Sequence, residues 1–371
     1  MSVLFVLHEA SRTGAPRVGG LIAAALQQHF DVRVLCLSDG PLIDWIRERV
    51  GPTRVSLLDY QNSRHQIPFA ERVRAARAAI EAEPCELVYV NSVAASEFVV
   101  AAKSAGIVTV LHVHEKAQAL RRILEIDLAK LEILALCDGV VLAAGELRKD
   151  LVEVFGFVPE RHFDFGIAVD AREIEDLAGD TDAAVYNAIG RPNRWGDRLT
   201  IGMCGYASRR KGSDIFFEVA AALPEHDFVW VGDWSRDEAP ENIVFDEYST
   251  RKLPNLYVTG GVDNPYKYIG RFDLFFLSSR EDPNPLVLTE ALLLGVPVFC
   301  FSRTTAVTDF LGRSAILCHG VVNTPDSVRV LRALDAAEIR SDAFRGLTAA
   351  YRDHFDVSKK IGGLVEFLSS L

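Results

Sequence analysis

Two groups of charged residues in the second half of the chain have the types and spacing of a ligand site. Arg209, Arg210 and Lys211 are three consecutive cations between an apolar run and a helix-like segment, in a protein whose net charge is −11. The N-terminus of a helix already favours anions, so added cations there indicate an anionic ligand such as a phosphate. Asp282 and Glu290, with seven residues between them, flank the loop that joins a second apolar run to its helix. In open α/β sheets ligands bind at such strand–loop–helix junctions, because free N–H groups point into the crevice.

The first half of the chain carries two further candidates, each at the end of an apolar run. Gly14 follows the first expected strand and has no Cβ, so the backbone there can approach a ligand closely; an ordinary tight turn is the alternative. Strand alternation puts His112 and His114 on one face at the end of an apolar strand, where polar residues face the ligand crevice. His114 is the better candidate, since His112 lies deeper in the strand and fits a core histidine. The His-x-His pair beside Glu115 has no third ligand at a recognisable spacing, so no metal site is predicted.

The elements that position these residues follow from the apolar periodicity. Short apolar runs alternate with amphipathic segments, which predicts parallel, doubly wound α/β sheets. Strands are expected at 3–7, 32–37, 55–58, 87–90, 108–113 and 140–143, and then at 201–204, 228–231, 256–259, 274–277, 298–301 and 315–317. Helices are expected at 20–29, 69–83, 94–105, 120–136 and 351–371, with another beginning near Leu286 and ending at Gly295. The pattern predicts two Rossmann-like units joined between residues 163 and 197.

Length and composition restrict the class of protein. At 371 residues the chain exceeds the usual size of a single core, which favours two domains. No apolar run approaches the 18 residues that indicate a membrane span, and the N-terminal residues resemble a first strand rather than a signal peptide. Six cysteines occur singly, as expected for a reducing compartment. The expected location is therefore the cytoplasm, and the net charge of −11 argues against nucleic acid as a partner.

The segment from Asp273 to Cys300 resembles the signature of the retaining glycosyltransferases of family 4. Ser-Ser-Arg precedes its two acids and Gly-Val-Pro-Val follows them. In that family two glutamates have this spacing, the first in contact with the transferred sugar and the second hydrogen-bonded to the ribose of the nucleotide. The resemblance implies that Asp282, or Glu281 if the loop is shifted, contacts the donor sugar and that Glu290 holds the ribose.

The resemblance extends in family order over nearly the whole chain and implies roles for the other candidates. Lys211, with either Arg209 or Arg210, is implied to grip the nucleotide diphosphate in place of a metal ion. Gly14 is implied to donate its N–H to the diphosphate when the domains close, and His114 to line the transfer site. Further donor contacts are implied after strands of the second unit, at Gly232, Val262, Asn284, Leu286 and Val287.

The chain departs from the family pattern at three of these places. Tyr206 stands where the family has an arginine, Thr13 replaces the first of two glycines, and Asp282 replaces the first glutamate. The first departure leaves open whether Arg209 or Arg210 supplies the second diphosphate contact.

The fold that the resemblance implies is GT-B, in which two Rossmann-like doubly wound domains face a central cleft. The expected domains are 1–170 on the acceptor side and 171–350 on the nucleotide-sugar donor side, with residues 351–371 forming a helix that crosses back to the N-terminal domain. Residues 120–136, preceded by Lys116, are expected either to touch a membrane at the inner face of the plasma membrane or to face the other domain.

The function that the resemblance implies is transfer of a sugar, with retention of configuration, from a UDP- or GDP-linked donor to a hydroxyl. The acceptor is expected to be a glycan, a lipid-linked molecule or a small molecule, in bacterial polysaccharide or glycoconjugate biosynthesis, and no cofactor is expected besides the substrate. Two alternatives share paired Rossmann-like lobes: a UDP-N-acetylglucosamine 2-epimerase and a solute-binding protein.

Overall fold

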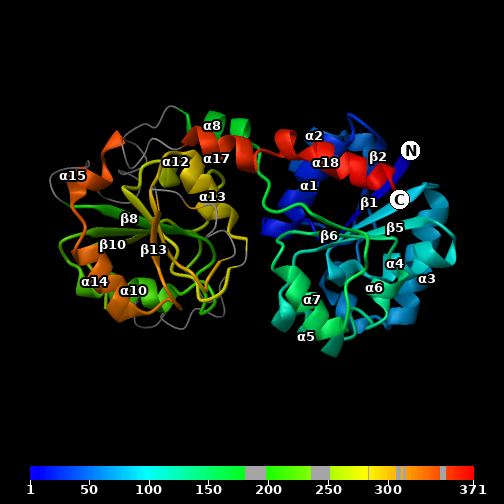
Figure 1. Ribbon diagram of the computed structural model, residues 1–371, viewed down its shortest axis with the longest axis horizontal. Helices are drawn as coiled ribbons and strands as arrows, with labels where there is room; N and C mark the ends of the chain where they lie inside the picture. The colour runs from blue at the N-terminus through cyan, green and yellow to red at the C-terminus, as the bar shows by residue number, and fades with distance from the viewer. Residues whose placement is uncertain (180–197, 235–250, 283, 306–310, 312–314, 343–347) are drawn as a thin grey trace. The chain divides into compact units, whose positions relative to one another are not determined.

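The computed structural model describes residues 1–179, 198–234, 251–282, 284–305, 311, 315–342 and 348–371 (Figure 1). The chain divides into two compact units. Unit 1 comprises Met1–Val169 together with Asp356–Leu371, and unit 2 comprises Asp170–Phe355. Within the described residues, no helix is long and apolar enough to cross a membrane.

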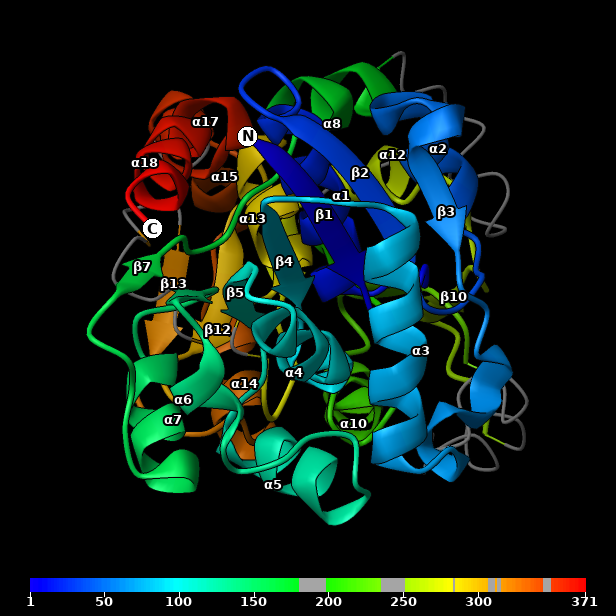
Figure 2. The same cartoon turned by 90° about the vertical axis from the view of Figure 1, so that its right-hand side faces the viewer.

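Unit 1 is built on a parallel sheet whose described strands follow the order β3-β2-β1-β4-β5-β6-β7. The strands are β1 (Ser2–Leu7), β2 (Asp31–Cys36), β3 (Val55–Leu57), β4 (Leu87–Asn91), β5 (Val108–Val113), β6 (Gly139–Leu142) and β7 (His162–Asp164). The helices are α1 (Gly14–Leu26), α2 (Ile43–Val50), α3 (Phe69–Ala82), α4 (Glu97–Ser104), α5 (Ala117–Glu125), α6 (Ile133–Leu136), α7 (Leu147–Phe155) and α18 (Val357–Ser369), with 3₁₀ turns η1 (Pro52–Arg54), η2 (Gln61–Gln66) and η3 (Val93–Ala95). Helices α3 and α4 pack against each other over the sheet (Figure 2).

The strand order determines where a ligand site can form. It reverses direction between β1 and β4, because the chain moves outward to β2 and β3 and then returns to the other side of β1. In open α/β sheets the loops at the carboxyl ends of these two central strands separate and leave a crevice. In unit 1 this point lies between the turn before α1 and the end of β4.

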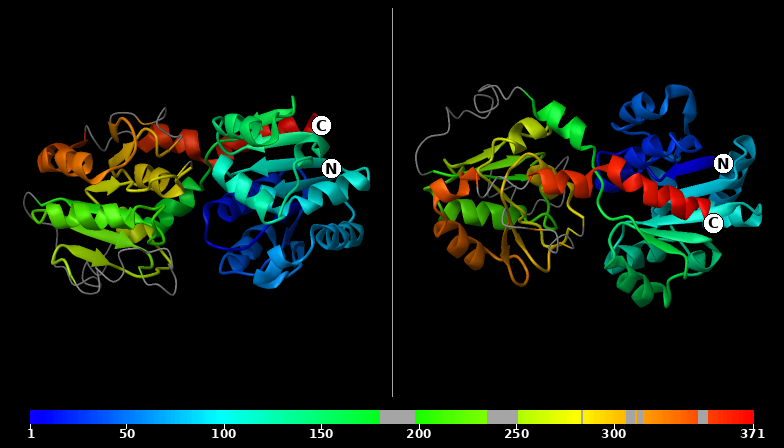
Figure 3. Two further views of the ribbon diagram at one scale, coloured as in Figure 1. Left: turned by 90° about the horizontal axis from the view of Figure 1, so that it is seen from below. Right: turned by 45° about the horizontal axis from the view of Figure 1, so that its top comes forward.

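The C-terminal helix α18 belongs to unit 1, along which it lies as the red helix of Figure 3. Its entry is fixed by Val357 N–H, which donates to the Val169 carbonyl at 2.9 Å, and it packs against α1. Phe367 stacks on Phe163 with ring centroids 5.7 Å apart, beside Gly363, where a Cβ would lie only 3.1 Å from the Phe163 ring. The terminal helix therefore completes the core of unit 1.

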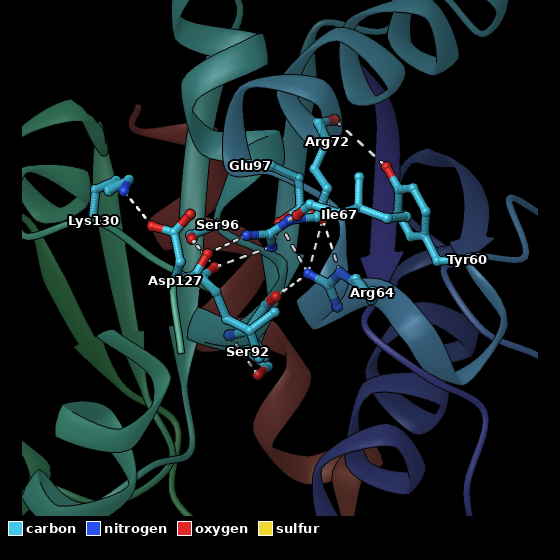
Figure 4. Close-up of polar contacts among 11 residues, drawn as sticks. Tyr60, Arg64, Ile67, Arg72, Ser92, Ser96, Glu97, Asp127 and Lys130 are labelled. Atoms are coloured by element: carbon cyan, nitrogen blue, oxygen red, sulfur yellow. Dashed lines mark hydrogen bonds and ion pairs between the residues drawn. The ribbon is translucent and has the colours of Figure 1, made fainter. Parts of the chain in front are cut away.

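A buried ionic cluster fixes three loops of unit 1 to one another (Figure 4). Glu97 at the start of α4 is fully buried; its carboxylate accepts hydrogen bonds from Arg64 Nε at 3.1 Å and Nη2 at 2.9 Å, and Arg72 Nη1 lies 3.5 Å away. Arg72 also donates to the carbonyls of Ile67, at 3.1 Å, and Asp127. Because a buried charge needs both a counter-ion and hydrogen bonds, the cluster holds the segments after β3, β4 and α5 in one arrangement.

Unit 2 repeats the same plan with the strand order β10-β9-β8-β11-β12-β13 in its described part, all pairs parallel. The strands are β8 (Thr200–Cys204), β9 (Asp227–Val231), β10 (Leu256–Val258), β11 (Leu274–Phe276), β12 (Val298–Phe301) and β13 (Ala315–Cys318). The described helices are α8 (Ala171–Ala178), α10 (Ser213–Ala222), α12 (Tyr266–Ile269), α13 (Leu286–Leu293), α14 (Thr324–Arg332), α15 (Ala336–Ile339) and α17 (Thr348–Phe355). Here the order reverses between β8 and β11, which makes their carboxyl ends the expected site.

The predicted α/β architecture of two Rossmann-like units with a returning terminal helix is confirmed. The expected single helix at 120–136 is wrong: α5 ends at Glu125, Asp127 has a φ of 58°, and α6 begins at Ile133. The tail likewise forms two helices, because Asp356 is extended and accepts a hydrogen bond from Ser358 N–H as the N-cap of α18. Strand β7 was not expected, since its three residues are too few to show a period.

Candidate functional site

The cation-bearing loop of unit 2 joins β8 to α10 and is pressed against the loop that follows β11. Gly212, with a φ of 70°, ends this loop, and a Cβ there would overlap the Ser278 carbonyl oxygen. Ser278 Oγ donates to the Lys211 carbonyl at 2.9 Å. Only glycine permits both the left-handed backbone and this close approach, so the two loops at the reversal point have a fixed relation.

Lys211 and Asp282 form an ion pair across these two loops. Both side chains are largely buried, at 15% and 10% exposure. Asp282 also accepts from Ser279 Oγ at 3.4 Å, and its N–H donates to the Thr304 carbonyl at 2.9 Å, so its position is set from three sides. The ammonium group of Lys211 is thereby held at the carboxyl end of the sheet beside a carboxylate.

Arg210 approaches the same acid from the solvent side. Its Nη1 donates to the Glu281 carbonyl at 3.0 Å and lies 3.9 Å from Asp282 Oδ1. Between the two neighbouring acids, it is the Asp282 carboxylate that faces Lys211 and Arg210. Arg209 has an exposed side chain and takes part in the loop through its carbonyl.

Arg280 is a contributor to the site that inspection of the sequence did not single out. Its guanidinium makes an ion pair with Asp214 in the first turn of α10, at 2.6 and 2.5 Å, and donates to the Arg209 carbonyl at 2.7 Å. This pairing raises the pKa of Arg280. Arg280 therefore holds the cation loop in place through Asp214 and the Arg209 carbonyl. Its position in the Ser-Ser-Arg sequence was the only local signal for this role.

Glu290 lies in the second turn of α13 and is 5% exposed. Tyr266 on α12 donates its hydroxyl to Glu290 Oε1 at 3.2 Å, a partner that sequence inspection also missed. Helix α13 begins after Pro285 without a side-chain cap, so the N–H groups of Leu286 and Val287 have no partner within the helix. Asn284 is half-buried just before them.

Cys204 at the end of β8 links Glu290 electrostatically to the ion pair. Burial raises the pKa of the Cys204 thiol to about 12; Glu290 adds to the rise and Lys211 opposes it. Glu290 and Lys211 therefore both lie near the end of β8.

The loop after β9 lies against the cation loop, and the loop after β10 lies against the loop after β9. Gly232 has a φ of 134°, and a Cβ there would overlap the Gly205 carbonyl oxygen. Gly261 N–H donates to Asp233 Oδ1 at 2.6 Å, which positions Val262, half-buried in the next place along the chain. The backbone of the loop after β9 thus lies next to the loop that carries Lys211.

In unit 1, Gly14 is the first residue of α1. The N-cap Thr13 makes no side-chain cap; its hydroxyl donates instead to Glu9 Oε1 at 3.3 Å, and Ser11 Oγ donates to the same oxygen at 2.5 Å. The side-chain oxygens of this turn therefore hydrogen-bond to one another, and the first N–H groups of the helix lack a side-chain cap.

His114 follows β5 and is held among polar groups. Its Nε2 lies 3.0 Å from Asn91 Oδ1, and its backbone N–H donates to Glu115 Oε2 at 2.8 Å. Burial, with a smaller effect of His8, lowers the pKa of His114 to about 3. The imidazole is therefore neutral at physiological pH.

His112 lies on the same face of the strand, and its ring centroid is 4.0 Å from that of His114. It is fully buried, its Nδ1 lies 2.9 Å from the Tyr89 hydroxyl, and burial lowers its pKa well below the ordinary value. Among the described residues its Nε2 has no hydrogen-bond partner. This is a core position, unlike that of His114.

The candidates thus form two groups, one in each unit. In unit 2 the structure places the cation loop next to Asp282 and next to the loop that contains Gly232. In unit 1 it places His114 at a strand end next to α1. No three His, Cys, Asp or Glu residues gather as metal ligands within the described part of the chain. Asp180 and Asp182, which form an Asp-x-Asp sequence, lie outside the described residues.

Comparison with known proteins agrees with this architecture. Residues 198–330 match the family model described as Glycosyl transferases group 1, and no curated protein matches the sequence. Among solved structures, Anabaena Alr3699/HepE in complex with UDP and glucose is 18% identical, with a TM-score of 0.78 over 100% of this chain and 99% of that one. WaaG, a glycosyltransferase involved in lipopolysaccharide biosynthesis, is 16% identical, with a TM-score of 0.72 over 100% of both chains.

A third neighbour is named for a different reaction. A Listeria monocytogenes protein assigned as a UDP-N-acetylglucosamine 2-epimerase is 14% identical, with a TM-score of 0.64 over 100% of this chain and 96% of that one. At such identities the structural likeness establishes the fold, which is GT-B. The family match, which spans β8 to most of α14, adds support for a glycosyltransferase at the level of the superfamily.

Proposed function

We propose that the protein is a retaining glycosyltransferase that moves a sugar from a nucleotide-sugar donor bound in unit 2 to an acceptor hydroxyl. The observation that carries this proposal is the pairing of Lys211 with Asp282 at the reversal point of the unit 2 sheet, with buried Glu290 beside the same strand end. The proposal assigns Lys211 to the diphosphate, Asp282 to the sugar and Glu290 to the ribose. All three fall inside the range that matches the glycosyltransferase family model.

In this proposal the leaving diphosphate takes over Lys211 from Asp282. As the bond between the anomeric carbon and the phosphate oxygen breaks, negative charge develops on the diphosphate, and a preorganised ammonium lowers the energy of that charge. Arg210 or Arg209 adds a second cation from the solvent side, so the cations fill the role that a metal ion has in other transferases. Released from its ion pair, Asp282 accepts hydrogen bonds from the donor sugar.

Glu290 is proposed to hold the nucleotide by its ribose. A carboxylate accepts hydrogen bonds from two neighbouring hydroxyls, and Tyr266, at 3.2 Å, keeps it oriented. The loops after β9 and β10 would offer backbone groups to the base at Gly232 and Val262. The N–H groups of Leu286 and Val287, at the uncapped start of α13, would face the diphosphate.

Retention is proposed to occur without a covalent enzyme intermediate. The acceptor oxygen bonds to the anomeric carbon on the face from which the diphosphate departs, and the acceptor proton passes to the departing phosphate oxygen. In unit 1, Gly14 would donate its N–H to the diphosphate, and His114 would line the transfer site. Neutral His114 fits the role of a hydrogen-bonding group and not that of an acid.

The substrates follow by analogy. Because HepE was crystallised with UDP-glucose, we take UDP as the first candidate nucleotide, with GDP as the second. A glycan or lipid-linked acceptor in polysaccharide or glycoconjugate synthesis is the proposed class. The protein would work in the cytoplasm; peripheral membrane contact would use exposed Ile126 and Leu131, which follow the cationic helix α5.

The test is a thermal-shift screen with UDP, GDP, ADP, dTDP and CDP, with and without magnesium. A ligand at 100 times its Kd stabilises the folded state by about 2.7 kcal/mol, which gives a clear shift. We expect one nucleotide to stabilise the protein without metal, and the Lys211→Ala variant to lose that shift. If no nucleotide shifts the wild type, the proposal fails.

The epimerase neighbour makes one alternative specific enough to test. An epimerase would convert UDP-N-acetylglucosamine without any acceptor, whereas a transferase would release the nucleotide rapidly only when an acceptor is present. Product analysis with and without acceptor separates the two activities.

A further inference from the structure

Asn91, the last residue of β4, is fully buried and uses both ends of its side-chain amide. Its Nδ2 donates to the Ala15 carbonyl at 3.0 Å, in the first turn of α1. Its Oδ1 lies 3.0 Å from His114 Nε2. The amide thus lies at the reversal point of the unit 1 sheet and joins the turn after β1 to the residue after β5.

These two contacts determine the orientation of the amide. A carbonyl oxygen only accepts hydrogen bonds, so the atom of Asn91 that faces Ala15 must be the NH₂ group. The oxygen of the amide then faces His114. Since that oxygen also only accepts, His114 Nε2 must carry the proton.

The other nitrogen of His114 is therefore defined as well. In a neutral imidazole with its proton on Nε2, Nδ1 is a lone-pair acceptor. The ring is neutral at physiological pH, and the structure gives Nδ1 no hydrogen-bond partner among the residues it describes. His114 is half-buried, and its Nδ1 is not one of the described side-chain atoms that are fully buried without a hydrogen-bond partner.

We propose that Asn91 is a positioning residue that holds His114 as the Nε2–H tautomer, so that Nδ1 accepts a hydrogen bond from a hydroxyl of the bound carbohydrate. This inference rests on the proposed function for the identity of the ligand, but not for the tautomer itself. A hydroxyl donor suits Nδ1, whereas a carboxylate or phosphate oxygen would set two acceptors against each other. Asn91 thereby makes this position selective for O–H groups.

The packing around Asn91 supports a dedicated position. Gly19 on α1 lies so close that a Cβ there would be 2.7 Å from Asn91 Nδ2. Helix α1 can approach β4 to this distance only because of Gly19, which brings the Ala15 carbonyl within reach of the amide. The same amide therefore connects His114 to the helix start at Gly14.

The tautomer can be measured directly by long-range ¹H–¹⁵N correlation NMR of the full chain labelled with ¹⁵N-histidine. A His114→Gln variant assigns the His114 signals. In the wild type we expect a protonated Nε2 and an unprotonated Nδ1. A wild-type His114 with its proton on Nδ1 would overturn the proposal.

Two Asn91 variants separate positioning from packing. Asn91→Asp keeps an oxygen toward Nε2 and should keep the proton there, although it loses the hydrogen bond to the Ala15 carbonyl. Asn91→Leu has a similar size but no acceptor and should give a mixture of tautomers. An unchanged tautomer in Asn91→Leu would refute the role. If Asn91→Leu fails to fold, the wild-type and Asn91→Asp spectra still decide the outcome.

A kinetic readout tests the consequence for transfer. With the nucleotide sugar identified by the thermal-shift screen, Asn91→Leu should lower turnover roughly 10- to 100-fold, as a displaced catalytic-site group does. The Kd of the nucleotide diphosphate should change by a smaller factor, because Lys211 and Glu290 of unit 2 supply the main contacts in the proposal. Asn91→Asp should recover part of the turnover. If no nucleotide binds the wild type, the proposed function fails while the NMR result stands; if nucleotide binds and Asn91→Leu turns over normally, this inference alone fails.

Discussion

The ion pair between Lys211 and Asp282 predicts that substitutions of its two members have opposite effects on the binding of the nucleotide diphosphate. If the diphosphate replaces Asp282 as the partner of Lys211, the carboxylate competes with the ligand. Lys211→Ala should then weaken binding of the nucleotide diphosphate, and Asp282→Asn should strengthen it, although both variants lose turnover.

The magnitudes follow from the burial of the pair. A hydrogen bond to a charged group contributes about 1.5–3 kcal/mol, so Lys211→Ala should weaken binding roughly 10- to 100-fold. Asp282→Asn leaves a neutral amide that still fits beside Ser279 Oγ, and it spares the ligand the cost of displacing an ion pair. Exposed ion pairs contribute up to about 1 kcal/mol, and this pair is largely buried, so we expect a gain of at least about 1 kcal/mol, or roughly fivefold tighter binding.

The measurement is isothermal titration of each variant with the nucleotide diphosphate selected by the thermal-shift screen, at one ionic strength. Lys267→Ala is the matched control, because Lys267 is an exposed cation on α12 of the same unit and should not change Kd. Equal weakening by Lys211→Ala and Asp282→Asn would refute the exchange of partners. Unchanged affinity in Lys211→Ala would remove Lys211 from the donor site.

Three further predictions address the loops, the buried cluster and pH. Gly212→Ala should abolish nucleotide binding, because its Cβ would overlap the Ser278 carbonyl; Gly156→Ala, at φ 83° with nothing within 4 Å, is the control and should bind normally in the same titration. Glu97→Ala should destabilise unit 1 by about 3–5 kcal/mol, since it leaves buried arginines unpaired, whereas the control Glu81→Ala, at an exposed position, should cost at most about 0.5 kcal/mol. Hydrogen exchange of unit 1 peptides in urea measures both losses of stability. Equal protection in the two variants would contradict the role of the cluster. Between pH 6.5 and about 3 an unfolded histidine is protonated and folded His114 is not, so the unfolded state binds more protons and the free energy of unfolding falls as pH falls. In urea unfolding over that pH range, His114→Gln should therefore lose less stability than the wild type. Parallel curves of stability against pH for the two proteins would contradict the lowered pKa of His114.

The sequence by itself determined the kinds of elements and their order. Apolar runs predicted every described strand except β7 to within a few residues, and Pro285 predicted the start of α13 at Leu286. Both signals are local, since they depend on hydrophobic periodicity and on the missing proline N–H. Local signals also have limits. The helix break near Asp127 carries neither glycine nor proline, and the three residues of β7 are too short to show a period.

The sequence predicted which residues are candidates for the site, but not which of them pair. The three cations and the two acids stood out by type and spacing, but nothing local said that Asp282 rather than Glu281 faces Lys211. The same holds for Arg280 behind the cation loop, and for Tyr266 against Glu290.

These pairings were decided by the order of strands in each sheet. Lys211 and Asp282 meet across 71 residues because β11 returns to lie beside β8, and Asn91 reaches both Ala15 and His114 because β4 lies between β1 and β5. Strand neighbours are selected by the packing of the whole domain, in which many apolar contacts of long sequence separation act together. Local periodicity shows which residues are buried, but only this packing determines which polar side chains meet at the carboxyl ends of the strands.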